Sequence, residues 1–177
     1  MRTLVLGGIR SGKSQWAEAA VARIAGDGVP VRYLATGPAA DTDPSWAERV
    51  GAHQARRPAH WHTVETRELA EDLAQSPDTA TLVDDIGGWL TAVMDRVGAW
   101  TGAPVDAEAD ALVAAVAAFT APLVLVTPEV GLTVVPATEA GRRFADELGS
   151  VNQRLAAVCD RVVLVVAGQP LTVKEPS

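Results

Sequence analysis

Near its start the sequence reads Gly7-Gly8-Ile9-Arg10-Ser11-Gly12-Lys13-Ser14, which fits the phosphate-loop pattern G-x-x-x-x-G-K-[ST] without a mismatch. Glycines let the backbone wrap closely around a phosphate group, because a side chain there would collide with it. The lysine of this pattern reaches the β- and γ-phosphates of a nucleoside triphosphate, and the final hydroxyl ligates Mg²⁺. We therefore predict a triphosphate site at residues 7–14, with Lys13 as a catalytic group and Ser14 as a ligand of Mg²⁺.

The residues on either side of this loop supply the strand and the helix that a phosphate loop connects. Leu4-Val5-Leu6 is typical of a short buried strand, and residues 15–24 carry apolar side chains at helical spacing. Backbone amides at the start of that helix would point at the bound anion. Because strand, loop and helix are all present, the pattern favours a nucleotide site over a Gly-rich turn that binds nothing.

Length and composition limit the class of protein. The 177 residues suffice for one domain, covering residues 1–177, and the 48% of hydrophobic residues suits a globular core. The net charge of −7 argues against nucleic-acid binding, which needs a broad basic surface. The single cysteine, Cys159, excludes an intrachain disulfide and fits a small core residue on a helical stretch. We see no leader peptide and no apolar run long enough for membrane insertion, so we expect a cytoplasmic protein.

Strands and helices are predicted to alternate along the rest of the chain. Apolar runs predict strands at residues 31–36, 81–85, 122–127 and 161–167, and an antiparallel edge strand at residues 171–174. Apolar periodicity predicts helices from residue 44 onward and at residues 68–73, 86–97, 106–119 and 137–157, the last with a break near Gly149. This alternation predicts an α/β fold with a mostly parallel central sheet flanked by helices. Ligands bind where the strands of such sheets end, so Thr36-Gly37-Pro38 is a candidate wall of the site.

A second part of the nucleotide site is predicted where the strand at residues 81–85 ends in two carboxylates. In phosphate-loop proteins, a carboxylate at a strand end holds Mg²⁺ directly or through water. We favour Asp84 over Asp85 for this role, and the alternative is an ordinary acidic strand end. The glycines that follow, Gly87 and Gly88, would let a neighbouring segment approach the start of the next helix closely.

All three histidines of the chain, at positions 53, 60 and 62, lie close together in sequence and beside two arginines. Three interpretations remain open. The side chains could belong to the surface or the core without any chemical role. They could bind zinc, although the spacing is not a standard ligand set and no cysteine is nearby. A neutral imidazole could instead attack an activated phosphate while arginines neutralise its charge, but the pattern does not choose among the three histidines.

Six pieces of the sequence are worth comparing together with known families. They are the phosphate loop, Tyr33-Leu34-Ala35-Thr36, His53-x-x-x-Arg57-Pro58-x-His60-Trp61, Glu129-Val130-Gly131 with Val135-Pro136 after it, Asn152-Gln153, and Val165-Val166-Ala167-Gly168. In this order, and over almost the whole chain, they resemble the bifunctional adenosylcobinamide kinase/adenosylcobinamide-phosphate guanylyltransferase family of cobalamin biosynthesis. The histidine segment and the Glu-Val-Gly segment are the most specific pieces of the resemblance.

The resemblance implies a RecA-like phosphate-loop NTPase fold, a homotrimer and two reactions. The first phosphorylates the side-chain hydroxyl of the corrinoid adenosylcobinamide with ATP or GTP. The second transfers GMP from GTP through a guanylylated histidine, which falls on His53. The implied nucleotide contacts are Gly7, Gly8, Ile9, Arg10, Ser11, Gly12, Lys13, Ser14, Thr36, Gly37, Pro38, His53, Gln54, Ala55, Arg56, Glu65 and Asp84, with Mg²⁺ at Ser14 and Asp84.

This sequence departs from the family's pattern in two places. Gly37-Pro38 stands where the family commonly has a polar turn, and Asp84 stands where it often has glutamate. Either Glu65 or Asp84 could accept hydrogen bonds from N1 and N2 of guanine and so select guanine over adenine. Two other functions remain as alternatives: a simple small-molecule kinase without a covalent step, and a nucleotide sensor without catalysis.

Overall fold

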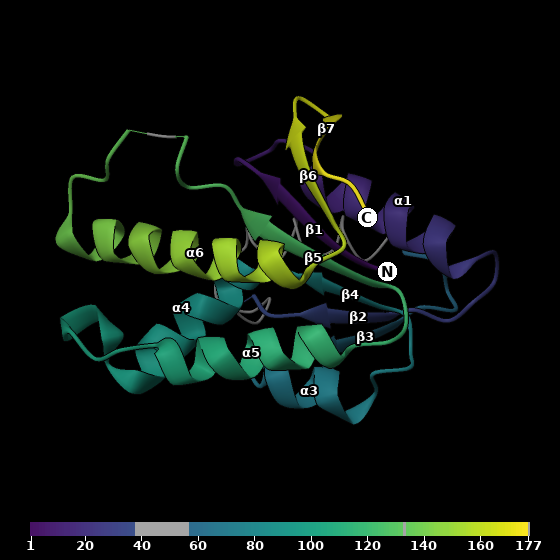
Figure 1. Ribbon diagram of the computed structural model, residues 1–177, viewed down its shortest axis with the longest axis horizontal. Helices are drawn as coiled ribbons and strands as arrows, with labels where there is room; N and C mark the ends of the chain where they lie inside the picture. The colour runs from purple at the N-terminus through teal and green to yellow at the C-terminus, as the bar shows by residue number, and fades with distance from the viewer. Residues whose placement is uncertain (38–56, 133, 177) are drawn as a thin grey trace.

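The structure is a computed structural model that describes residues 1–37, 57–132 and 134–176. In this part of the chain, seven strands form one sheet in the order β3-β2-β4-β5-β1-β6-β7 (Figure 1). The strands are β1 (Arg2–Gly7), β2 (Arg32–Ala35), β3 (His62–Glu65), β4 (Thr81–Asp84), β5 (Leu123–Pro128), β6 (Arg161–Val166) and β7 (Gln169–Lys174). All neighbouring pairs are parallel except β6 and β7, so the carboxyl ends of β1 to β6 share one edge of the sheet.

Helices cover both faces of this sheet. They are α1 (Lys13–Ala25), α3 (Leu69–Gln75), α4 (Ile86–Val97), α5 (Asp106–Ala118) and α6 (Glu139–Val158), with a short 3-10 helix, η2 (Ala99–Thr101). Figure 1 shows α3, α4, α5 and α6 gathered on one side of the sheet, with α1 on the other. Successive side chains of a strand point to opposite faces, so Leu4 of β1 packs under the four-helix side and Val5 packs under α1.

The predicted α/β class, the mostly parallel sheet and the antiparallel carboxyl-terminal edge are all confirmed. Within the edge pair, Leu164 of β6 lies opposite Leu171 of β7. Strand β3 was not predicted, because only Val64 among its four residues is apolar and the strand is largely exposed at the edge of the sheet. The helix predicted from residue 44 lies outside the described residues.

The predicted break in the last helix is wrong, because α6 runs without interruption from Glu139 to Val158. A glycine in a helix interior costs about 1 kcal/mol relative to alanine, which made Gly149 look like a break. The packing of α6 overrides that cost, with Leu148, Val151 and Leu155 fully or almost fully buried in the core. An ideal Cβ placed on Gly149 would meet no atom within 4 Å, so the space beside this residue is open.

Cys159 is a core residue, as predicted, but it lies directly after α6 rather than within it. Burial raises the pKa of its thiol to about 12. The thiol therefore stays protonated at neutral pH, which leaves it a small packing group without nucleophilic character.

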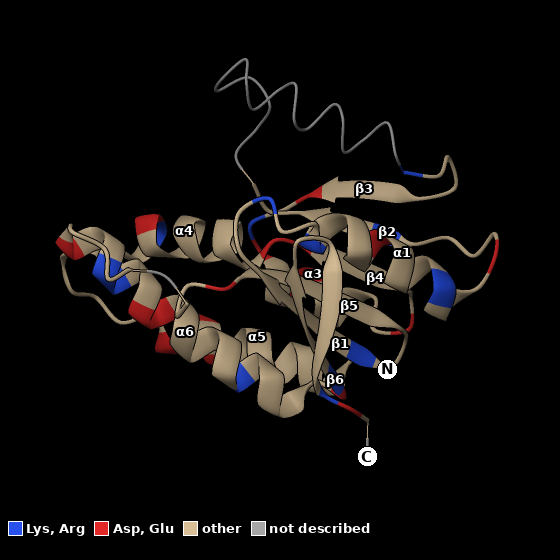
Figure 2. Cartoon of the chain, turned by 90° about the horizontal axis from the view of Figure 1, so that it is seen from above, with Lys and Arg blue, Asp and Glu red and all other residues tan. Residues whose placement is uncertain are grey.

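Charged side chains lie mainly on helices and loops, whereas the strands are largely free of them (Figure 2). This distribution follows from burial of the sheet on both faces, since parallel strands covered by helices are apolar along most of their length. Among the helices that the structure describes, none is long and apolar enough to cross a membrane.

Candidate active site

The phosphate loop joins β1 to α1 and depends on two of its glycines. A Cβ on Gly7 would collide with Ser11 Oγ and would lie 2.9 Å from the carbonyl oxygen of Val165, so the surrounding backbone would have to move. Gly12, directly before α1, has φ of 91° in the left-handed region, and a Cβ there would approach Gly168 Cα at 3.1 Å. A side chain at either position would therefore strain the loop or displace its neighbours.

The turn between β6 and β7 supports the loop from outside. The Gly168 amide donates a hydrogen bond of 2.7 Å to the carbonyl oxygen of Ser11. Together with the Val165 oxygen beside Gly7, this contact explains why residues 165–168 carried part of the sequence resemblance. The shape of the phosphate loop is thus fixed partly by the far end of the chain.

Lys13 and Ser14 begin α1 and carry the two functional groups of the loop. The Lys13 ammonium donates to the carbonyl oxygen of Gly8 at 3.3 Å, so its side chain folds back over the loop. The Ser14 hydroxyl donates to Asp84 Oδ1, also at 3.3 Å, and connects the loop to the end of β4. The structure therefore brings Ser14 and Asp84 together, which is the arrangement expected of the predicted Mg²⁺ site.

Tyr33 holds the Asp84 carboxylate from its other side. The Tyr33 hydroxyl donates a hydrogen bond of 2.6 Å to Asp84 Oδ2. Burial, together with the nearby Asp84 charge, raises the pKa of Tyr33 far above its ordinary value, so the phenol remains a donor. The Arg57 guanidinium lies 3.4 Å from the centre of the Tyr33 ring and also donates to Thr63 Oγ1 at 2.9 Å. A chain of contacts thus runs from Arg57 through Tyr33 to Asp84.

Asp85 has a different environment from its neighbour Asp84. Its carboxylate accepts a hydrogen bond of 2.7 Å from the Gly88 amide and caps α4. Burial raises the pKa of Asp85, while the Gly88 amide acts in the opposite direction. The Asp85 backbone exchanges two hydrogen bonds with the Thr36 hydroxyl. Asp85 thus joins β2 to α4, which leaves Asp84 as the carboxylate beside the loop.

The predicted close approach at the start of α4 is confirmed. A Cβ on Gly87 would lie 2.9 Å from Pro128 Cγ, and one on Gly88 would lie 3.1 Å from the Thr36 carbonyl oxygen. The two glycines let α4 begin against the ends of β5 and β2. Thr36 is buried beside the start of α4, and its place in the wall of the nucleotide site stays a prediction.

Of the remaining predicted nucleotide contacts, some lie at the carboxyl ends of strands and the others lie outside the described residues. Glu65 is exposed at the carboxyl end of β3, and Ala35 of β2 lies between it and Asp84 in the sheet. Two strand spacings separate the backbones of Glu65 and Asp84 by about 10 Å. Gly37 follows Thr36 at the same edge of the sheet. Pro38, His53, Gln54, Ala55 and Arg56 lie outside the described residues.

His60 and His62 are not brought to the phosphate loop. His62 begins β3 opposite Arg32, the first residue of β2, so both histidines lie towards the amino-terminal edge of the sheet. The phosphate loop follows the carboxyl end of β1, at the opposite edge. Within the described residues there is no cluster of three metal-binding side chains, so the zinc interpretation gains no support there.

Asn152 is a structural contributor to the site that the sequence reasoning did not assign. It is only 7% exposed, and its side chain accepts from Thr127 Oγ1 at 2.7 Å and donates to the Pro128 carbonyl oxygen at 3.1 Å. The next residue, Glu129, donates its amide to the Gly7 carbonyl oxygen at 3.1 Å. The only sequence signal for this bracing role was a polar residue, Asn152, on the apolar face of α6 beside the buried Val151 and Leu155.

Comparison with known structures identifies the fold. An ATPase from the type III secretion system of pathogenic bacteria superposes with a TM-score of 0.57 and 14% sequence identity. The superposition covers 92% of this chain and 50% of the ATPase chain, so the protein spans about half the length of that structure. At this identity the likeness concerns the fold alone, and it confirms the phosphate-loop NTPase fold.

Comparison with known sequences identifies the family. The bifunctional adenosylcobalamin biosynthesis protein CobP of Pseudomonas aeruginosa is 39% identical over 182 residues, which cover 98% of each chain. The protein CobU of Salmonella typhimurium, with the same description, is 40% identical over 189 residues, which cover 98% of this chain and all of that one. The CobU protein of Escherichia coli is 36% identical over 187 residues. Since residues 3–173 also match the family model itself, the chain belongs to the cobinamide kinase/cobinamide phosphate guanyltransferase family.

Proposed function

We propose that this kinase and guanylyltransferase phosphorylates adenosylcobinamide with ATP or GTP, then transfers GMP from GTP to give adenosylcobinamide-GDP. The observation that carries the proposal is a phosphate loop whose Ser14 hydroxyl lies 3.3 Å from the Asp84 carboxylate. Family membership supplies the corrinoid class of substrate, and the loop supplies the triphosphate site. A single domain carrying both reactions, a homotrimer and a cytoplasmic location are part of the same proposal.

The oxygen donors at this site fit Mg²⁺. A serine hydroxyl and a carboxylate are hard ligands of the kind that Mg²⁺ binds together with phosphate oxygens and water. In our proposal Ser14 ligates the ion directly, and Asp84 holds it directly or through water. When bound, the ion neutralises charge on the phosphates. The Lys13 ammonium adds a fixed positive charge at the same phosphates, and the amides at the start of α1 orient them.

The proposed transfer of GMP proceeds in two displacements at the α-phosphorus. First, a neutral imidazole nitrogen of His53 bonds to the α-phosphorus of GTP, and the bond to the pyrophosphate oxygen breaks as pyrophosphate leaves. Then a phosphate oxygen of adenosylcobinamide phosphate bonds to the same phosphorus, and the phosphorus–nitrogen bond breaks to release His53. The positions of His60 and His62, near the amino-terminal edge of the sheet, support the choice of His53.

One labelling experiment separates this proposal from its alternatives. The protein is incubated with α-labelled GTP and denatured, and the label that stays attached is tested in acid and alkali. We expect acid-labile, alkali-stable label, which is the behaviour of a phosphoramidate. Phosphorylation of cobinamide without attached label would instead indicate a simple kinase, and tight GTP binding without either activity would indicate a sensor.

The Asp84→Asn variant tests the proposed Mg²⁺ role. The substitution keeps the shape of the side chain but removes the charge that faces Ser14. We expect both activities to fall by about 10- to 100-fold, the usual effect of disturbing a metal site, and to recover partly with excess Mg²⁺. Activity is measured over a range of Mg²⁺ concentrations with GTP and with ATP. Relaxed discrimination between GTP and ATP would assign Asp84 to guanine instead, and no change in either property would remove it from the site.

The Tyr33→Phe variant tests whether the Asp84 carboxylate must be held in place. The substitution removes the 2.6 Å hydrogen bond to Asp84 Oδ2 but keeps the ring beneath Arg57. We expect the Mg²⁺ concentration for half-maximal activity to rise about tenfold or more, as for other partners of metal ligands. At saturating Mg²⁺ the turnover should approach that of the wild type. An unchanged Mg²⁺ requirement would show that the hydrogen bond serves the fold alone.

A further inference from the structure

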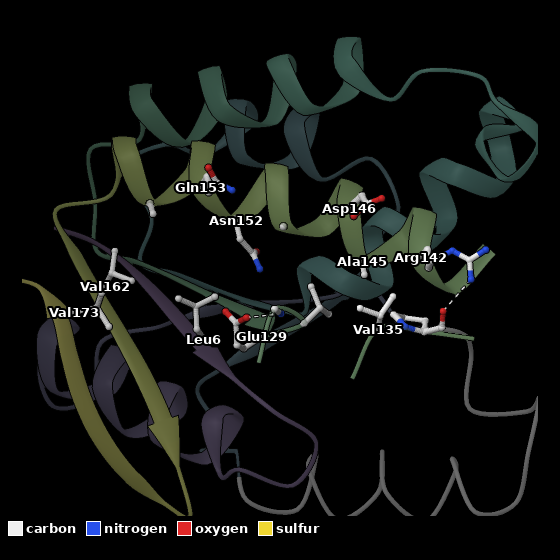
Figure 3. A pocket seen from close by; sticks show the side chains of 15 residues that line it. Leu6, Glu129, Val135, Arg142, Ala145, Asp146, Asn152, Gln153, Val162 and Val173 are labelled. Atoms are coloured by element: carbon white, nitrogen blue, oxygen red, sulfur yellow. Dashed lines mark hydrogen bonds between the residues drawn. The ribbon is translucent and has the colours of Figure 1, made fainter. Parts of the chain in front are cut away.

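A pocket of about 500 Å³ lies between α6, the strands β1, β6 and β7, and the segment that follows β5 (Figure 3). This volume is typical of pockets that bind small molecules. None of its lining residues belongs to the nucleotide contacts predicted above. The pocket is therefore separate from the triphosphate site, and the proposed nucleotide chemistry leaves it unexplained.

One wall of the pocket is joined directly to the phosphate loop. Leu6, which lines the pocket, immediately precedes Gly7 in the loop. Glu129, which also lines it, donates its amide to the Gly7 carbonyl oxygen at 3.1 Å. Figure 3 shows Asn152 of α6 directed towards these two residues. A ligand in the pocket would thus lie beside the phosphates that the loop holds, and a kinase needs its acceptor hydroxyl at such a place.

The lining chemistry favours a ligand without phosphate groups over a second nucleotide. Apolar side chains such as Leu6 and Val162 form part of the wall, and the carboxylates of Glu129 and Asp146 would repel phosphates. Among the described residues, Arg142 is the one basic residue that lines the pocket, and its guanidinium donates to the carbonyl oxygens of Pro136 and Ala137 at 3.1 and 2.9 Å. The pocket suits a partly apolar molecule that carries hydroxyl and amide groups.

The rim of the pocket extends the apolar surface towards solvent. Val135 lines the pocket and is 73% exposed, and its neighbours Leu132 and Val134 are 76% and 91% exposed. Such exposed apolar side chains mark binding surfaces when they adjoin a pocket. A ligand larger than the pocket could place one arm inside and rest its remaining apolar body on this rim.

We propose that this pocket binds the acceptor of the kinase reaction, a corrinoid, through its uncharged hydroxyl-bearing arm. The arm enters between α6 and the strands with its hydroxyl directed towards Glu129 and the phosphate loop. The rest of the corrinoid, which is larger than the pocket, lies over the rim formed by Leu132, Val134 and Val135. This inference rests on the proposed function, since it assumes that a corrinoid is phosphorylated.

Gly149 offers a way to close the pocket without touching the nucleotide site. It lines the pocket from the middle of α6, and a Cβ added there would meet no atom within 4 Å. The Gly149→Leu variant therefore places a side chain in the open space. We expect the KM for adenosylcobinamide to rise about tenfold or more, the effect of modest steric interference on binding. The KM for the nucleotide and self-guanylylation by α-labelled GTP should stay within about threefold of wild type.

Two further variants serve as controls. Gly149→Ala adds only a methyl group and should change the KM for adenosylcobinamide by less than the leucine variant does. Ser150→Leu puts the same added side chain on the neighbouring, exposed position of α6, which does not line the pocket, and should leave every constant unchanged. Thermal melting of each variant verifies that α6 remains folded. If Gly149→Leu does not fold, Ala145→Leu narrows the same pocket and replaces it.

The possible results separate a failure of the proposed corrinoid pocket from a failure of the proposed function. A folded Gly149→Leu or Ala145→Leu protein with a wild-type KM for adenosylcobinamide would overturn the proposed pocket. Wild-type protein that neither phosphorylates adenosylcobinamide nor becomes guanylylated would overturn the proposed function instead. A raised KM for the nucleotide in the leucine variants, without an effect on the corrinoid, would assign the pocket to the nucleotide and also overturn the inference.

Discussion

Replacing His53 with alanine should abolish covalent labelling of the protein by α-labelled GTP. The proposed intermediate joins the α-phosphorus to an imidazole nitrogen, and alanine offers no nucleophile in its place. Nucleotide binding and part of the kinase activity should remain, because the phosphate loop and Asp84 are unchanged. The label is measured on denatured protein, and nucleotide binding and cobinamide phosphorylation are measured on the same preparation.

The matched controls are His60→Ala and His62→Ala, which should still become labelled even if slowly. Both histidines lie at the amino-terminal side of β3, away from the loop. Attack also requires a neutral imidazole, so labelling of the wild type should decline as the pH falls below about 6.5, the ordinary histidine value. Peptide mapping that places GMP on His60 or His62 would refute the assignment to His53 while leaving the guanylyltransferase activity standing.

Replacing Lys13 with alanine should lower phosphorylation and guanylylation together, each by roughly two to four orders of magnitude. This is the usual effect of losing one charged group that stabilises a transition state. The side chain bonds only to the Gly8 carbonyl oxygen at 3.3 Å among the described residues, so its removal leaves the loop's other contacts in place. Both reactions are followed by single-turnover kinetics with labelled nucleotide.

Lys174→Ala provides a comparison for the Lys13 variant. Lys174 has a structural role instead, because its ammonium donates to the carbonyl oxygens of Ala156, Ala157 and Cys159 at the end of α6. Its removal should lower the melting temperature without a selective loss of catalysis. Retention of either activity at wild-type level in Lys13→Ala would show that the two reactions use separate phosphate sites.

The sequence predicted well those strands and helices whose apolar residues are spaced as burial of one or both faces requires. β5 and β6 are apolar because helices cover both faces of the sheet. The phosphate-loop pattern requires glycines because a side chain at Gly7 would clash with the carbonyl oxygen of Val165. β3 escaped prediction because its pairing with β2 relies on backbone hydrogen bonds rather than on apolar side chains. Gly149 misled the prediction because local propensity does not report the core packing of α6.

The sequence predicted those parts of the candidate site that belong to a known motif. It did not predict contacts that depend on which strands are neighbours in the sheet. Ser14 and Asp84 are 70 positions apart, yet the known pairing of a loop hydroxyl with a strand-end acid was enough to associate them. The Tyr33 hydrogen bond to Asp84 and the Asn152 contact with Pro128 depend on strand order, which the sequence does not state. The pocket beneath α6 was not predicted, although Glu129, Val135 and Asn152 belong to segments that carried the resemblance, because its shape arises from the packing of separate elements.

The contact between the Gly168 amide and the Ser11 carbonyl oxygen has a consequence for synthesis of the protein. The phosphate loop is synthesised well before β6 and the turn that brace it, because roughly 150 residues separate the two segments. At about 5–20 residues per second, the ribosome needs roughly 8–30 s to translate the residues between them, and during this time β1 lacks its β6 neighbour. Early in synthesis the loop therefore lacks the hydrogen bond that Gly168 donates to Ser11, and we expect its folded shape to become stable only after the turn between β6 and β7 has been made.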